Sequence, residues 1–161
     1  MKKVILVMAL ALIGATAFSQ EAKENGTIYI SHPYIEVVKK TIKAYLAQDD
    51  ATSLSLFADT AKWWSSGMAK PINIKEAVKS WDTDFTYYDS IAIKVVGYPD
   101  FLHYKDMDAK VVQSWWAWSG KSKRTKVWVT VDFVQFDSFN KDGKIDFEGI
   151  YGDWSKMISN Q

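Results

Sequence analysis

The sequence predicts an α+β fold with an antiparallel sheet and helices on one of its faces. Apolar residues recur at three- and four-residue steps up to about residue 81, and at every second residue from about residue 90. Helices that precede a run of strands are typical of this class. The chain has 161 residues, of which 48% are hydrophobic, and its charges are nearly balanced. These values are sufficient for one folded domain with its own core.

The helical half begins in the stretch SHPYIEVVKKTIKAYLAQDD. Ser31 is placed to cap a first helix, and Pro33 suits its first turn. A second, short helix is expected over 51–58. The stretch NIKE resembles a capping box with Asn73 as the N-cap, so a third helix should start there and end near residues 80–81.

Four later segments alternate between apolar and polar residues and are predicted as strands: 90–98, 109–120, 126–138 and 143–154. In the third segment one face carries Val127, Val129, Val131 and Phe133, and the other carries Trp128, Thr130, Asp132, Val134 and Phe136. Both faces are rich in apolar residues, but helices on one side cover only one of them. The second face therefore predicts a homodimer formed through the sheet.

The first 19 residues have the pattern of a signal peptide, so we expect an exported protein, periplasmic or secreted. Lysines precede a 15-residue apolar run, and AFS precedes a predicted cut between Ser19 and Gln20. An uncleaved membrane anchor is the alternative, but a bilayer-spanning helix needs roughly 20 apolar residues. Residues 20–30 are then a flexible mature N-terminus and 31–161 a single domain, with no membrane association after cleavage.

Composition excludes several kinds of chemistry. The chain has no Cys, so disulfides, thiolate catalysis and Cys-ligated metals are excluded. Without the signal peptide, 18 Lys and Arg face 19 Asp and Glu, and the basic cluster at 121–126 is interpreted as a turn between strands, so no nucleic-acid partner is expected. Two His without a spaced ligand motif do not predict a zinc site. No phosphate-binding loop or dinucleotide fingerprint is present, and no cofactor is predicted.

The stretch NKDGKID resembles a calcium-binding EF-hand loop. With Gly143 at the sixth position, several oxygen ligands fit. The first and twelfth positions, however, fall on Ser138 and Gly149, while Asp137 and Glu148 each miss by one residue. The flanking segments also alternate like strands rather than helices. We therefore predict a β-hairpin turn and no metal site.

The order of these elements resembles the nuclear-transport-factor-2-like superfamily, which includes SnoaL-like polyketide cyclases and ketosteroid isomerases. The resemblance covers residues 34–158, and its most specific parts are LFAD, FNKDGKI and YGDW. It implies a cystatin-like α+β cone, in which a curved antiparallel sheet wraps around the N-terminal helices. It also implies a hollow that is open at one end and a dimer formed through the sheet.

The resemblance further implies that a single SnoaL-like domain binds a small hydrophobic or aromatic ligand in an aromatic-lined cavity, with or without catalysis. The chain has eight Trp, and 15% of its residues are aromatic. The rings expected to line the cavity are Trp63, Trp64, Trp116, Trp118, Trp128 and Tyr151. The alternative is that these rings form only the core and the dimer interface, since cores and pockets are lined alike.

Ketosteroid isomerases use an Asp base, with a Tyr and a protonated Asp as hydrogen-bond donors. On this chain, the resemblance places the Tyr position at Thr41, the base at Ser65 and the second Asp at Asp132. A serine hydroxyl is not basic near neutral pH. Ketosteroid isomerisation is therefore not expected.

Three side chains are candidate acid–base groups. Asp132 lies mid-strand with Trp128 and Phe136 on the same face, so it is either a pocket acid or the partner of a surface cation. Asp153 in YGDW matches the acid that SnoaL-like cyclases have near the end of the last strand, or else it faces water. His103 is either an acid–base group at the cavity mouth or a structural residue. The alternative function is thus an isomerase-, cyclase- or hydratase-type enzyme that uses these three groups.

Overall fold

The computed structural model describes residues 22–161, so the predicted signal peptide lies outside the described residues. The helices are α2 (Pro33–Leu46), α3 (Asp50–Leu56), α4 (Ile74–Tyr87) and α5 (Ser155–Asn160). The strands are β1 (Gly26–Tyr29), β2 (Phe57–Ser65), β3 (Ile72–Asn73), β4 (Tyr88–Val95), β5 (Asp100–Tyr104), β6 (Lys110–Ser122), β7 (Trp128–Phe139) and β8 (Ile145–Gly152). None of the helices in this part of the chain is long and apolar enough to cross a membrane.

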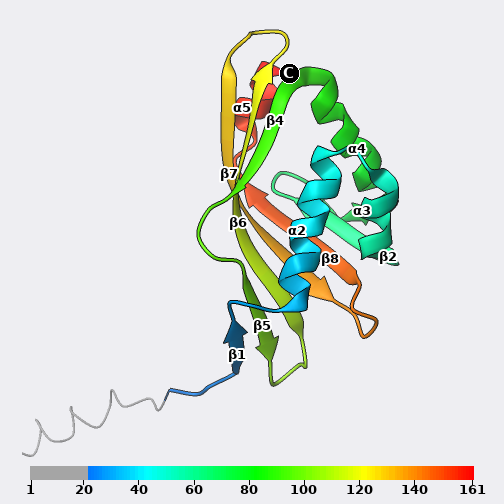
Figure 1. The fold of residues 1–161 in the computed structure, drawn as a ribbon, viewed down its shortest axis with the longest axis vertical. Helices are drawn as coiled ribbons and strands as arrows, with labels where there is room; N and C mark the ends of the chain where they lie inside the picture. Colours follow the sequence, from blue (N-terminus) through cyan, green and yellow to red (C-terminus); the bar gives the residue numbers. More distant parts are fainter. Residues whose placement is uncertain (1–21) are drawn as a thin grey trace, which may run out of the picture.

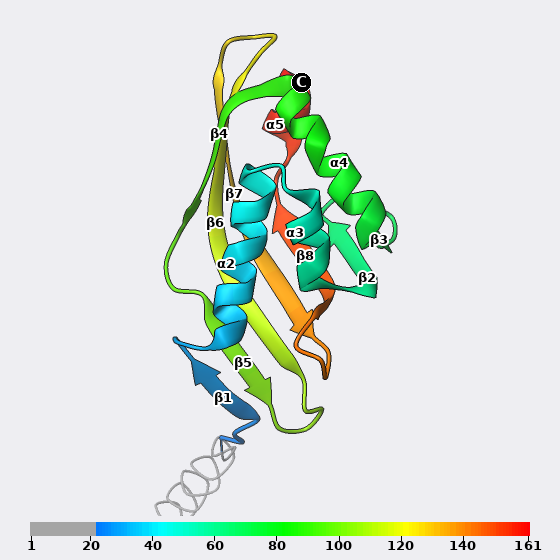
Figure 2. The ribbon, with the colours of Figure 1, turned by 45° about the vertical axis from the view of Figure 1, so that its right-hand side comes forward.

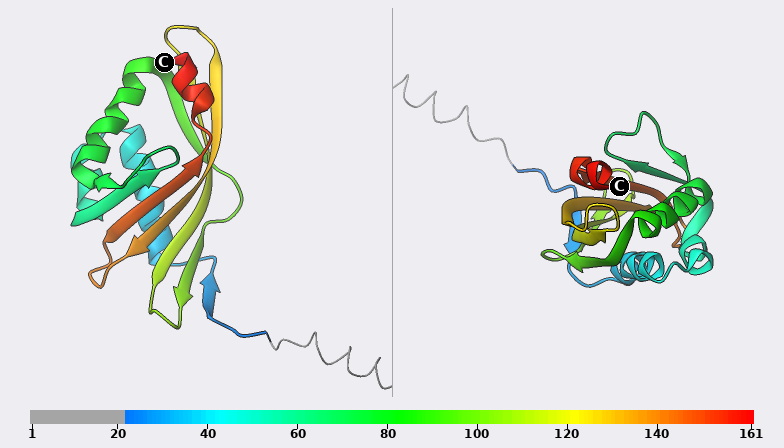
Figure 3. Two further views of the ribbon diagram at one scale, coloured as in Figure 1. Left: turned by 180° about the vertical axis from the view of Figure 1, so that it is seen from behind. Right: turned by 90° about the horizontal axis from the view of Figure 1, so that it is seen from above.

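The strands form one curved eight-stranded sheet in the order β1-β5-β6-β7-β8-β2-β3, with β4 also pairing with β6. Neighbours are antiparallel except β2 and β8, which run parallel. Strands β1 and β5 lie at one end of the molecule, and α5 and the C-terminus lie at the other (Figure 1). Helices α2 and α4 lie against one face (Figure 2), and from behind β7 and β8 lie in front of α2 (Figure 3). The predicted α+β fold with a curved sheet around N-terminal helices is confirmed.

The helix starts are close to their predicted positions. The first N-cap is His32, whose Nδ1 accepts a hydrogen bond from the backbone N–H of Tyr34 at 3.2 Å, so the prediction of Ser31 was wrong by one residue. Asn73 is confirmed as the cap of α4, because its Oδ1 accepts from the N–H of Lys75 at 2.9 Å. Helix α4 continues to Tyr87, beyond its predicted end, since no Gly or Pro interrupts it.

Five elements were not predicted, namely β1, β2, β3, β5 and α5. Residues 26–29 form the edge strand β1 beside β5. The predicted helix over 51–58 ends at Leu56, and FADTAKWWS continues as strand β2, which pairs with β8. The short helix α5 follows β8, and its buried Met157 accepts a hydrogen bond from the Tyr88 hydroxyl through its backbone carbonyl, at 2.6 Å.

The predicted hairpin between β7 and β8 is confirmed. The Oδ1 atom of Asn140 accepts hydrogen bonds from the backbone N–H groups of Asp142 at 2.9 Å and Lys144 at 3.0 Å. Gly143 has a φ of +72°, a conformation that favours glycine. Within residues 22–161, no group of three or more His, Asp or Glu side chains is placed to hold a metal ion.

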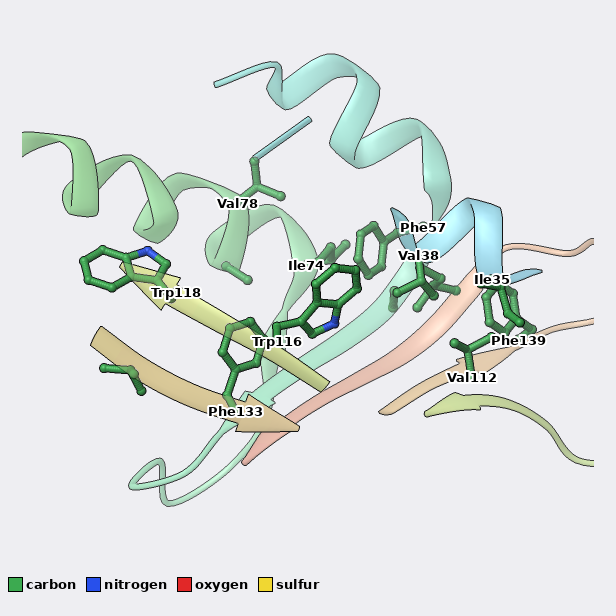
Figure 4. Close-up of a cluster of buried hydrophobic side chains, with 14 of the residues drawn as sticks. Ile35, Val38, Phe57, Ile74, Val78, Val112, Trp116, Trp118, Phe133 and Phe139 are labelled. Carbon is green, nitrogen blue, oxygen red and sulfur yellow. The ribbon is translucent and has the colours of Figure 1, made fainter. Parts of the chain in front are cut away.

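The core lies between the helices and the inner face of the sheet, which is the face that α2 and α4 cover. Strand β7 alternates as predicted: Val129, Val131 and Phe133 are buried, whereas Trp128, Thr130 and Asp132 are exposed. Figure 4 shows part of the core, from Ile35, Val112 and Phe139 at one end to Trp118 and Val78 at the other. Burial of these side chains, at about 1.5–3 kcal/mol for each large one, stabilises the fold in the absence of disulfides.

Candidate functional site

A pocket of about 240 Å³ lies between the helices and the inner face of the sheet. This volume is below the roughly 300–1,000 Å³ that is usual for drug-sized ligands, so the pocket suits a small molecule. Six aromatic side chains line it: Tyr45, Trp63, Trp81, Trp118, Phe133 and Trp154. The polar side chains in its wall are Thr41, Ser65, Ser80, Asp84, Gln135, Glu148 and Gln161.

Two carboxyl groups meet at the base of this pocket. Asp137 on β7 and Glu148 on β8 are direct partners across the two strands. Asp137 is 0% exposed and Glu148 is 3% exposed. Asp137 faces inward because the alternation of β7 continues without a break. Glu148 also faces inward, because the pairing of β7 and β8 shifts by one residue between Ser138 and Phe139 and so changes which residues of β8 point inward. Bulges of this kind reorient side chains and often lie near active sites.

The side chain of Gln135 connects the two acids. Its Nε2 donates to both carboxyl oxygens of Asp137, at 3.2 and 2.9 Å, and to Oε2 of Glu148 at 3.0 Å. Gln135 is itself only 1% exposed. Buried amide donors of this kind hold carboxyl groups in a fixed orientation, so the pair is preorganised before any ligand enters.

Burial keeps this pair partly protonated. Burial raises the pKa of Asp137 well above its ordinary value, and the neighbouring charge of Glu148 raises it further. Burial also raises the pKa of Glu148 to about 7, against a smaller, opposing effect of a hydrogen bond with Asp137. That bond favours the proton on Asp137, which donates it to Glu148. The burial of both carboxyls therefore favours their protonated forms, and the pKa of Glu148 lies near neutral pH.

Two indole N–H groups in the pocket wall, of Trp63 and Trp154, are buried without a hydrogen-bond partner among the described residues. Strand β2 runs parallel to β8 and places Trp63 next to Glu148. The indole of Trp63 lowers the pKa of Glu148, but its Nε1–H lies outside hydrogen-bonding geometry and, like Nε1–H of Trp154, has no partner in the described chain. An unpaired buried donor costs about 1–3 kcal/mol. Both rings thus offer a donor to an oxygen atom of a ligand.

A second acid lies elsewhere in the pocket wall. Oδ2 of Asp84 on α4 accepts a hydrogen bond from the Tyr45 hydroxyl at 2.8 Å, and Nε1 of Trp118 donates to that hydroxyl at 3.1 Å. Burial raises the pKa of Asp84 to about 6, while the bond from Tyr45 acts in the opposite direction. Burial, together with the charge of Asp84, raises the pKa of Tyr45. The tyrosine is thus a permanent donor to the carboxyl group at neutral pH.

The three acid–base candidates from the sequence lie outside this pocket and are not brought together. Asp132 is exposed on the outer face of the sheet, opposite Ala117. Asp153 is exposed, and hydrogen bonds from Ser155 lower its pKa. His103 lies on strand β5, in the end of the sheet farthest from α5, and its Nε2 is 2.7 Å from Oδ1 of Asp108.

The six predicted cavity rings divide among three environments. Trp63 and Trp118 line the pocket. Trp116 is buried in the core, where its Nε1 donates to Oγ of Ser114 at 2.8 Å. The others lie on the outer face of the sheet: Tyr151 contacts Trp64 at a centroid distance of 5.1 Å, and Trp128 is exposed. Strand parity decides this division, because neighbouring residues such as Trp63 and Trp64 point to opposite faces.

The acids that line or underlie the pocket were not predicted from the sequence. Asp137 has the same parity as Val129, Val131 and Phe133, so continuing the alternation would have placed it inside. Glu148 had no such signal, because the register shift reverses its face. Of the isomerase positions, Thr41 and Ser65 do line the pocket.

No protein-family model and no curated protein matches this chain. Solved structures are similar over most of its length. IdmH, a putative polyketide cyclase from Streptomyces antibioticus, is 14% identical with a TM-score of 0.63, over 80% of this chain and 98% of that one. The epoxide hydrolase/cyclase-like enzyme SalBIII is 13% identical, with a TM-score of 0.61, over 77% of this chain and 93% of that one. A protein from Catenulispora acidiphila with a ketosteroid isomerase-like fold, in complex with trimethylamine, is 12% identical, with a TM-score of 0.61 over 78% and 91%.

Proposed function

We propose, on the premise that this chain has the nuclear-transport-factor-2-like fold, that it binds a small, mostly apolar molecule in the pocket and exchanges a proton with it through Glu148. The observation that carries the proposal is the buried Asp137–Glu148 pair beneath an aromatic-walled pocket. Buried carboxyl groups with displaced pKa values in a pocket are typical of functional sites.

Glu148 is the acid–base group in this proposal because it lines the pocket, whereas Asp137 lies behind it. A pKa near 7 suits a group that must both accept and return a proton. Asp137 is a positioning residue, since it retains its own proton and donates it to Glu148. Glu148 would take a proton from one atom of the bound molecule and return it to another, as an isomerisation, a ring closure or an addition of water requires.

The free indole donors of Trp63 and Trp154 support a ligand that carries at least one oxygen atom. An oxygen that accepts from them would lie in a largely apolar surrounding, where developing negative charge is stabilised by fixed donors. Cyclase-type chemistry is named for two of the similar structures, IdmH and SalBIII, and is consistent with this class of reaction. Because their identity to this chain is only 13–14%, they support the fold, and the pocket residues support the chemistry.

Binding without catalysis is the second candidate function. It is favoured by the low exposure of Glu148, 3%, which limits its contact with a ligand, and by Ser65 at the position that the resemblance assigns to the base. A serine hydroxyl has no basic form near neutral pH.

Tryptophan fluorescence distinguishes these functions. A panel of small ketones, lactones and epoxides should include compounds that quench the emission of the pocket tryptophans. Bound compounds are then followed by NMR for conversion, with the wild type, Glu148→Gln and the outer-face control Asp132→Asn. Catalysis predicts that Glu148→Gln still binds but loses conversion by at least about 100-fold, the usual contribution of an acid–base group, and that the control converts normally. Binding with no conversion by the wild type supports the second function, and no binding by any compound contradicts both.

We also propose that the outer aromatic residues Trp64, Phe136 and Tyr151 pair with a second copy of the chain, and that the protein is exported after cleavage following Ser19. The first proposal is supported by the exposed ring of Tyr151, which contacts the half-buried rings of Trp64 and Phe136 on a sheet face without a helix over it among the described residues. Light scattering of the wild type and of Tyr151→Ser tests the dimer. Mass spectrometry of the N-terminus of the expressed protein tests the cleavage.

A further inference from the structure

Carboxyl groups lie at two places in the pocket wall, but no basic side chain is among its described lining residues. Asp84 and Glu148 line the pocket, and Asp137 lies behind. Within residues 22–161 none of these three acids forms an ion pair with a basic side chain. A buried carboxylate is costly unless a positive charge or several donors offset it. The pocket therefore disfavours an anionic ligand, and its acids lack a cation.

Aromatic side chains surround the Asp84 end of the pocket. Tyr45, which donates to Asp84, lies at ring-centroid distances of 5.2 Å from Phe85 and 6.3 Å from Trp81. Trp81 is in turn 6.3 Å from Trp63. Trp118 donates to the Tyr45 hydroxyl from the sheet side. The faces of such rings attract cations, most strongly where water is excluded, and a carboxyl group beside them adds to that attraction.

We propose that the ligand of this pocket is a small organic cation, an amine or quaternary ammonium compound whose charged group lies against Asp84 among these rings. The inference rests on the proposed function, because it names the chemical class that the same pocket takes. The apolar part of the ligand extends toward Trp63 and Glu148, which line the same cavity.

Nearby basic residues are already engaged outside the pocket. Arg124 donates to the backbone carbonyls of Ser159 and Gln161. Lys123 donates to the carbonyl of Phe85 at 2.8 Å and lies 3.5 Å from Asp89. Neither residue lines the cavity, so neither neutralises Asp84.

In the absence of such a ligand, a proton neutralises the Asp84 carboxyl only at mildly acidic pH. Burial raises the pKa of Asp84 to about 6. The other titratable groups around it are Tyr45 from α2, Tyr88 from β4 and Glu148 from β8, and none of them supplies a positive charge. At neutral pH and above, the carboxyl is therefore mostly ionised, and a cationic ligand would pair with it directly.

Three probes of similar size and different charge test the inference. Phenyltrimethylammonium is the cation, tert-butylbenzene is its neutral isostere and benzoate is an anion. Dissociation constants are measured at pH 8 by tryptophan fluorescence and calorimetry on the full chain. We expect the cation to bind at least about tenfold more tightly than the neutral isostere, and benzoate to bind most weakly.

Two matched variants locate the charge. Asp84→Asn should bring the affinities for phenyltrimethylammonium and tert-butylbenzene to within about threefold of each other, whereas Asp132→Asn on the outer face should leave the wild-type preference intact. If Asp84→Asn does not fold, the affinities of the wild type for the three probes still show whether the pocket prefers a cation. Equal binding of the cation and the neutral isostere, or tighter binding of benzoate, would overturn the inference and leave the proposed function standing. Failure of all three probes to bind would overturn the inference, and the panel of ketones, lactones and epoxides then decides the proposed function separately.

Discussion

Two aspartate residues, one on each face of strand β7, have different properties. Asp132 lies on the outer face in contact with water, opposite Ala117. Asp137 lies on the inner face, is 0% exposed and is opposite Glu148, with a pKa raised by burial. The two residues are on opposite faces because side chains alternate along a strand. Which face an acid occupies, rather than its presence in the sequence, therefore decides whether it can take part in chemistry.

The aromatic residues repeat this contrast. On the inner face, Trp118 is 3% exposed and donates to Tyr45, so it fixes the wall of the pocket. On the outer face, Trp128 and Tyr151 are 58% and 54% exposed. The inner rings should therefore affect stability and ligand binding, and the outer rings should affect association with other molecules.

The largest expected difference between the faces is in the pH dependence of stability. Because burial raises the pKa of Glu148 from 4.5 to about 7, the folded state binds this proton more tightly than the unfolded state. The resulting stabilisation is complete below pH 4.5 and is lost as the pH rises through 7, a change of about 3 kcal/mol. Urea unfolding at pH 5 and pH 8 should show this decline in the wild type and in Asp132→Asn. The decline should be smaller by about 3 kcal/mol in Glu148→Gln, where the raised pKa values of Asp137 and Asp84 still contribute, and an equal decline there would contradict the assignment.

The next effect concerns the amide that connects the two acids. Gln135→Met keeps the volume but removes the donor to Asp137 and Glu148, which should lower the free energy of unfolding by about 1–3 kcal/mol. The loss should be greater at pH 8 than at pH 5, since Glu148 is ionised at pH 8 and the bond from Gln135 to its Oε2 is then charge-assisted. Gln113→Met, at a half-buried position on the outer face of β6, is the matched control. Similar losses in both variants at both pH values would show that the amide has no special role.

A smaller effect is expected at the second acid. Tyr45→Phe removes the hydroxyl that donates to Asp84 and accepts from Trp118, which should cost about 1 kcal/mol. Because the Tyr45 bond lowers the pKa of Asp84, its loss should raise that pKa above about 6. An NMR titration of the Asp84 carboxyl carbon measures this change. Tyr151→Phe on the outer face serves as control, and an unchanged titration in Tyr45→Phe would count against the hydrogen bond.

The smallest effect on stability is expected on the outer face. Trp128→Thr replaces an exposed ring, so the free energy of unfolding should change by less than about 0.5 kcal/mol. Chemical denaturation of the isolated protein at low concentration measures it. A loss of several times this size would mean that Trp128 packs against part of the same chain, and the contrast between the faces would need revision.

The sequence predicted the fold class, the β7–β8 hairpin and the two faces of β7, because alternation and turn residues are local signals. It predicted part of the pocket wall, since Trp63 and Trp118 line it. It did not predict the acids. The apparent calcium loop drew attention to Asp137 and Glu148 only as residues that missed a ligand position, yet the strand pairing places them side by side.

The remaining differences have physical reasons. The register shift beside Glu148 depends on how β7 and β8 pair, and a single sequence does not reveal such a shift. Asp84 lies on helix α4 beyond the predicted end of that helix. Its position in the pocket wall was therefore not predicted, because the helix is longer than the sequence indicated. Both residues acquire their properties from long-range packing, whereas Asp132 was chosen for its apolar neighbours along one strand.

In the proposed function, a carboxyl pair beneath the pocket exchanges a proton near neutral pH. A carbon-13 NMR titration of the Glu side-chain carboxyl groups tests it most directly, with Glu148→Gln to assign the signal and Asp132→Asn as control. The structure predicts one Glu carboxyl that titrates at about pH 7, is absent from Glu148→Gln and is retained in Asp132→Asn. A Glu148 signal that titrates at the ordinary value of 4.5 would contradict the account.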